Sequence, residues 1–131
     1  MAANNYATSL ITLESFEEAK ALLRKMMPVA RRELGEEDGT TLTMRGCYAM
    51  AIYQNNRATL EDLHEAVTTL EETERIARRV LGGAHPLTAG IDTTLRNARV
   101  VLHARESLLA QYLLYGASAL AITAFALFRR R

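Results

Sequence analysis

One stretch of this 131-residue chain occurs twice. The segment Ala30–Gly35, Ala-Arg-Arg-Glu-Leu-Gly, returns as Ala77–Gly82, Ala-Arg-Arg-Val-Leu-Gly, and the pair Tyr6-Ala7 returns as Tyr48-Ala49. A unit of about 40 residues that recurs in one chain is a supersecondary module that buries its apolar face by stacking on its neighbours. The repeat therefore predicts a short solenoid, whose usual function is binding.

Composition favours helix throughout. The chain has only 2 Pro and 7 Gly and no Trp, and its hydrophobic fraction of 49% is ordinary for a folded domain, so we expect an all-α protein. The 16 basic and 15 acidic residues give a net charge of +1, which argues against a nucleic-acid partner. The single cysteine, Cys47, excludes an intrachain disulfide and fits a reducing compartment, and the amino terminus lacks the pattern of a secretory signal.

Apolar spacing and capping residues predict five helical segments before the carboxyl end. They run from Asn4 or Asn5 to Leu13, from Phe16 to Leu34, from Thr40 to Tyr53, from Thr59 to Leu81, and from Pro86 to about residue 106. In the first of them the apolar positions Tyr6, Leu10, Ile11 and Leu13 keep near-helical spacing. Thr59 and Asp62 predict a capping box at the start of the fourth, in which the shorter acid replaces Glu or Gln.

The motif residues of the two units follow a known pattern. They are Tyr6, Ala7, Phe16, Glu17, Glu18, Ala19, Leu34 and Gly35 in the first unit, and Tyr48, Ala49, Leu63, Glu65, Ala66, Leu81, Gly82, His85, Pro86 and Thr88 in the second. Over about residues 4–104 this pattern resembles the tetratricopeptide repeat, in the longer variety of about 42 residues that kinesin light chains carry. The first linker departs from it, with Asp38-Gly39 in place of His-Pro, and the second unit is longer by a segment around Gln54–Thr59.

The resemblance implies a short right-handed α-solenoid of antiparallel helix hairpins, with units at about 4–39 and 40–85, a half unit at 86–106, and a separate apolar helix at 107–131. It also implies a non-enzymatic adaptor that binds a protein or peptide on the face lined by the first helix of each unit. The contact candidates on that face are Thr8, Thr12, Arg45, Gln54, Asp92 and Arg96. The alternative interpretation of each is an ordinary solvated position.

The carboxyl end has the length and composition of a membrane span. Leu108 to Phe128 contains no charged residue and would form about 31 Å of helix, close to the hydrocarbon thickness of a bilayer, about 30 Å. The residues placed to lie in the two membrane interfaces are Tyr112, Tyr115, Phe128, Arg129, Arg130 and Arg131. We therefore expect a tail anchor that holds the repeat domain on the cytosolic side, with the mitochondrial outer membrane favoured because short basic-ended tails resemble those of its proteins.

A soluble cytoplasmic module is the alternative hypothesis. In that case the last helix would cap the open end of the stack, or would pair with a second copy in a homo-oligomer. A cap should have a polar outer face, but apart from the tyrosines the segment has only Gln111, Ser118 and Thr123 as polar side chains.

No pattern in the sequence points to catalysis or to a cofactor. The histidines, His64, His85 and His103, are widely spaced and have no partner cysteine or glutamate at a metal-binding interval. Gly82-Gly83 is too short to cradle a phosphate and is not followed by Lys and Ser or Thr. We expect neither an enzyme nor a metal site.

Overall fold

The computed structural model describes residues 2–129, and this part of the chain is entirely helical, without strands. The helices are α1 (Ala2–Thr12), α2 (Phe16–Leu34), α3 (Gly39–Tyr53), α4 (Leu60–Leu81) and α5 (Pro86–Phe128). The predicted all-α fold with a long apolar carboxyl-terminal helix is confirmed.

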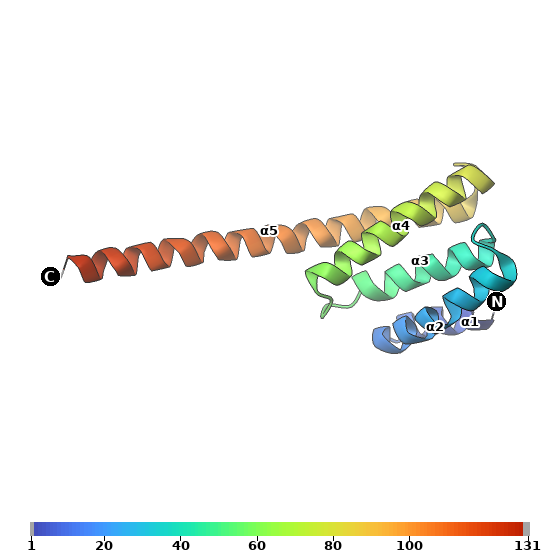
Figure 1. Cartoon of the computed structure of the whole chain (residues 1–131), viewed down its shortest axis with the longest axis horizontal. Helices are drawn as coiled ribbons and strands as arrows, with labels where there is room; N and C mark the ends of the chain where they lie inside the picture. Colours follow the sequence, from blue (N-terminus) through green and yellow to red (C-terminus); the bar gives the residue numbers. More distant parts are fainter. Residues whose placement is uncertain (1, 130–131) are drawn as a thin grey trace.

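Successive helices run in opposite directions and form a stack of hairpins (Figure 1). The α1–α2 and α3–α4 turns lie at one end of the stack, and the α2–α3 and α4–α5 turns lie at the other (Figure 1). Each helix packs on the next, and α3 also packs on both α1 and α5. The odd-numbered helices therefore form one layer of the stack, which α2 and α4 cover from one side.

Short polar motifs set the helix boundaries. Asp38 accepts a hydrogen bond from the Thr40 backbone N–H (2.8 Å) at the start of α3, and Thr59 and Asp62 form the predicted capping box at the start of α4. His85 Nδ1 accepts from the Leu87 N–H (3.1 Å) at the start of α5. At the carboxyl ends of α2 and α4, Gly35 and Gly82 have φ of 95° and 86°, a conformation that only glycine adopts freely.

The core lies between the layers and contains apolar residues of all five helices. Leu23, Leu42, Leu63 and Leu70 are fully buried between neighbouring helices. Of the apolar positions predicted for the first helix, Leu10 and Ile11 are buried, whereas Tyr6 and Leu13 are 58% and 73% exposed. The helix α1 has neighbours on one side only, so a narrower face of it is buried than on α3.

The first helix also begins earlier than predicted, at Ala2. Asn4 is therefore not a cap. It lies inside α1, is buried, and donates from its side-chain amide to the Thr40 backbone oxygen (3.2 Å) at the start of α3. This bond ties the first hairpin to the second.

The helix α5 is one continuous element of 43 residues. Its first half is part of the stack and buries Thr88, Ile91, Leu95 and Ala98, whereas every described residue from Leu108 onward is exposed. Sequence analysis placed a boundary between residues 106 and 107. The helix passes this point unbroken because no Gly or Pro lies between Gly90 and Gly116.

Candidate functional site

An apolar groove runs between α3 and α5 on the layer of odd-numbered helices. It has a volume of about 230 Å³ and is lined by Thr43, Gly46, Cys47, Met50, Pro86, Leu87, Gly90, Ile91 and Thr94. None of these side chains is charged, although 24% of the chain is Asp, Glu, Lys or Arg. The groove therefore suits an uncharged, partly apolar partner surface.

Two glycines face this groove from the interiors of their helices. A Cβ added at Gly46 or at Gly90 would meet no atom within 4 Å, so neither glycine is needed for packing inside the fold. Glycine inside a helix is less favourable than alanine by about 0.5–1 kcal/mol. The open space at both positions would let the backbone of a bound partner come close to α3 and α5.

Cys47 lies in the same groove and is half-buried. Its Sγ is 3.9 Å from Thr8 Oγ1 on α1. Burial raises the pKa of the Cys47 thiol, and the contact with Thr8 opposes this rise only in part. The thiol is therefore neutral at physiological pH and is not an activated nucleophile.

Four of the six predicted contact residues lie on the outer surfaces of α1 and α5, with their polar groups already paired. The hydroxyls of Thr8 and Thr12 donate to the backbone oxygens of Asn4 and Thr8 (both 2.9 Å). Arg96 donates to Asp92 (2.7 Å), one turn earlier on α5. None of the four lines the groove.

The prediction that Arg45 is an exposed contact residue is wrong. Its side chain is only 5% exposed, and its guanidinium donates to Glu72 on α4 (2.8 Å) and to Glu36 in the α2–α3 turn (3.3 Å). Position 45 lies on the face of α3 that meets α4 and this turn, so the charge is a link inside the stack.

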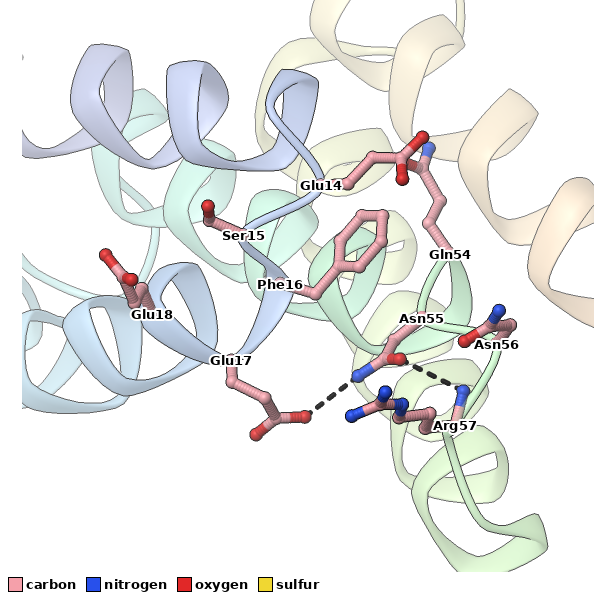
Figure 2. A pocket seen from close by; sticks show the side chains of 9 residues that line it. All are labelled: Glu14, Ser15, Phe16, Glu17, Glu18, Gln54, Asn55, Asn56 and Arg57. Atoms are coloured by element: carbon pink, nitrogen blue, oxygen red, sulfur yellow. Dashed lines mark hydrogen bonds between the residues drawn. The ribbon is translucent and has the colours of Figure 1, made fainter.

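Gln54 belongs to a different site, a hollow of about 520 Å³ at one end of the stack. Figure 2 shows its lining, which comes from the α1–α2 turn, the first turn of α2 and the α3–α4 turn: Glu14, Ser15, Phe16, Glu17, Glu18, Gln54, Asn55, Asn56 and Arg57. Asn55 donates to Glu17 (2.8 Å) and accepts from the Arg57 backbone N–H (3.0 Å). The sequence shows that the second unit is longer than the first. It does not show that the lengthened α3–α4 turn lies next to the α1–α2 turn.

A polar network on the other side of the stack joins α2, α3 and α4. Tyr48 accepts a hydrogen bond from Arg24 (2.8 Å) and donates one to Glu65 (2.7 Å). Burial and the bond to Glu65 raise the pKa of Tyr48, and the bond to Tyr48 raises the pKa of Arg24. Because Tyr48 itself is buried where the three helices meet, we interpret this network as a support of the fold.

The exposed half of α5 is the largest unpartnered apolar surface of the described chain. The predicted interface residues Tyr112, Tyr115, Phe128 and Arg129 are all exposed, whereas Arg130 and Arg131 lie outside the described residues. The hydroxyls of Ser118 and Thr123 donate to the backbone oxygens of Leu114 and Ala119 (both 2.9 Å). By length and composition, α5 contains one segment that could cross a membrane.

Among residues 2–129, no three His, Cys, Asp or Glu side chains gather closely enough to hold a metal ion. Comparison with known proteins gives no further guide. No family model matches the chain, and no curated protein or solved structure matches it significantly.

Proposed function

We propose that this chain is a non-enzymatic adaptor. In this proposal a tetratricopeptide-like stack of helix hairpins binds a protein or peptide partner, and the segment Leu108–Phe128 of α5 spans an intracellular membrane and tethers the stack. The observation that carries the proposal is that this uncharged segment leaves the stack with all of its residues exposed. An apolar surface of this length is unfavourable in water. A bilayer would bury it on all sides of the helix.

The Ser118 and Thr123 hydroxyls in the middle of the segment fit a lipid environment. Inside a bilayer every polar group needs a partner within the protein, and the hydroxyls of Ser118 and Thr123 already bond to the helix's own carbonyl oxygens. Tyr112 and Tyr115 lie near one end of the span and Phe128 at the other, where aromatic side chains prefer the membrane interfaces. We place the stack on the cytosolic side. Of the possible membranes we favour the mitochondrial outer membrane, because the arginines after the span resemble the basic tails of its proteins.

The span is tested by placing a charge at its centre. We expect Leu120→Arg to move the full-length protein from carbonate-resistant membranes to the soluble fraction, because a central arginine opposes insertion by about 2.5–3.5 kcal/mol. The matched control is Val100→Arg, at an exposed position of α5 before the span, which should stay in the membrane fraction. A wild-type protein that is soluble and monodisperse without detergent would contradict the proposal.

The binding function is supported by the uncharged groove between α3 and α5 and by the resemblance to tetratricopeptide repeats. Gly90→Leu would place an apolar side chain in the groove, where a Cβ at position 90 meets no atom within 4 Å. We expect this variant to keep its helix content and to lose the partners that the wild-type protein captures from a detergent extract. Thr93→Leu, at an exposed position of α5 that does not line the groove, should retain them. Loss of the same partners in both variants would argue against the groove.

The second candidate function is a soluble structural module that pairs with another copy through α5. The same exposed apolar surface favours it, because a second helix could cover part of that surface. In the structure the segment leaves the stack and does not cap its open end. A defined dimer that forms without detergent and is broken by Leu120→Arg would support this candidate over the membrane span.

A further inference from the structure

The span and the stack share one helix, so the position of one fixes the position of the other. Building on the proposed function, we propose that one end of the stack rests on the lipid headgroups of the membrane that α5 crosses. This resting end carries the α1–α2 and α3–α4 turns, from which α5 runs out (Figure 1). The partner of this surface is the bilayer itself.

Helix geometry sets the level of the headgroups along α5. The hydrocarbon core is about 30 Å thick and the bilayer with its headgroups about 40–45 Å, so each headgroup layer adds about 5–7 Å. At 1.5 Å per residue, this layer covers about four residues before the span begins at Leu108. Residues 104–107 therefore lie among the headgroups.

These same residues of α5 touch the resting end of the stack. Arg105 donates to the backbone oxygens of Ala58 (2.9 Å) and Asn56 (3.3 Å) in the α3–α4 turn. Next to it, Glu106 Oε1 lies 3.2 Å from His64 Nε2 on the first turns of α4. The α3–α4 turn and the start of α4 are therefore held at the level of the headgroup layer.

Side-chain bonds hold the first hairpin at the same end. Glu17 at the start of α2 accepts from Asn55 in the α3–α4 turn (2.8 Å), and Lys20 one turn later pairs with Asp62 (3.3 Å). Leu13, in the α1–α2 turn, is 73% exposed, and contact with the membrane interface would account for this apolar side chain. The hollow of Figure 2 lies between the same two turns.

The charges at the resting end indicate whether its contact with the membrane depends on anionic lipid. The exposed acids around the two turns, Glu14, Glu17, Glu18 and Glu61, outnumber the exposed Arg57. Anionic lipid would therefore not strengthen the contact. The contact is imposed by the span and should form on zwitterionic phosphatidylcholine alone.

Fluorescent labels at single cysteines test this placement in the full-length protein. Cys47→Ala removes the native thiol, and Asn56→Cys, Ala84→Cys and Ala119→Cys place the label in the α3–α4 turn, in the α4–α5 turn or in the span. The first two sites are exposed turn positions at opposite ends of the stack, about 30 Å apart along α5. The proteins are reconstituted into phosphatidylcholine vesicles that carry a nitroxide quencher on the headgroup or on the acyl chain.

We expect the headgroup quencher to remove most of the fluorescence at position 56 and to leave that at position 84 nearly unchanged. The acyl-chain quencher should remove most of the signal at position 119. Quenching at 119 with none at 56 would overturn the resting end but leave the span intact, and equal quenching at 56 and 84 would mean that the stack lies on its side. No quenching at 119 would overturn the proposed membrane function itself, and with it this placement.

Discussion

Tyr48 is the residue on which three helices meet. It is buried on α3, and its hydroxyl bridges Arg24 on α2 and Glu65 on α4. We expect Tyr48→Phe to lower the free energy of unfolding by about 1 kcal/mol. The change removes the hydrogen bonds of the hydroxyl to Arg24 and Glu65, and water can partly take the place of the hydroxyl. Tyr48→Ala should lower it by about 3 kcal/mol or more, because it also opens a cavity.

Urea unfolding followed by circular dichroism measures both changes. Tyr53→Phe is the matched control, because Tyr53 is another buried tyrosine of α3 that is not part of this network, and it should change the unfolding free energy little. Equal losses for Tyr48→Phe and Tyr53→Phe would show that the bridging hydroxyl contributes nothing.

Arg45 gives a second prediction for a single residue. Arg45→Met keeps the apolar stem but removes both ion pairs, and it should destabilise the stack by about 1–2 kcal/mol, because two hydrogen bonds between charged groups are lost. Arg31→Met, which removes a more exposed partner of Glu36, should lower the free energy of unfolding by no more than about 0.5 kcal/mol. The two variants are compared by their denaturant midpoints, and a reversed order would contradict the interior role of Arg45.

At this scale the sequence was a good guide to the buried apolar residues and a poor one to the polar ones. Tyr48 and Leu63, two motif residues of the second unit, lie in the core. Arg45 was assigned to the surface because the repeat resemblance places the first helix of each unit on the binding face, but its charged partners come from α4 and the α2–α3 turn. Gly46 and Gly90 were missed because a glycine inside a predicted helix looks like a weakness until the open space beside it is known.

The contribution of the α4 capping box to stability should depend on pH, because one of its members is the carboxyl group of Asp62. Hydrogen bonds from the Thr59 backbone and hydroxyl, with a smaller contribution from Lys20, lower the pKa of Asp62. A carboxyl whose pKa is lower in the folded state stabilises the fold above its unfolded pKa, about 3.9, and this contribution is lost as pH falls through the folded pKa.

The stability difference between the wild-type protein and Asp62→Asn should therefore be full near pH 6 and shrink as the pH is lowered below about 4. Urea titrations at several pH values measure it. Glu61→Gln, at the exposed position next to Asp62, should show no comparable change. A difference that does not depend on pH would mean that the Asp62 charge has no part in the cap.

The ends of most helices could be predicted because local motifs set them. Asp38, Thr59 and His85 all cap helices close to the predicted starts, and Gly35 and Gly82 stop helices where expected. The union of the last two predicted segments into α5 was harder to foresee, because the change in composition near residue 106 looked like a boundary. The composition of a helix reflects whether it is surrounded by water, protein or lipid. The helix itself continues until a residue such as Gly or Pro interrupts it.

On the scale of the whole molecule, the stack should not depend on the exposed half of α5. Every described residue after Ser107 is exposed, so ending the chain there should leave the unfolding free energy of the remaining domain within about 0.5 kcal/mol of the full-length value. Ending it after Leu95 also removes Ala98 and Arg105 with their contacts to the stack, and it should destabilise the domain severely. Circular dichroism of the two truncated proteins checks both outcomes. A truncation after Ser107 that unfolds would show that the tail supports the stack.

The unbroken course of α5 has a mechanical consequence. No hinge separates the membrane-spanning half of α5 from the half that belongs to the stack. Any tilt of the span is therefore passed on in full to the stack. A tilt of about 20° would swing the far end of the stack, about 30 Å away, sideways by about 10 Å. Since bilayer thickness influences the tilt of a crossing helix, the same protein would present its groove at a different angle in a thicker or a thinner membrane.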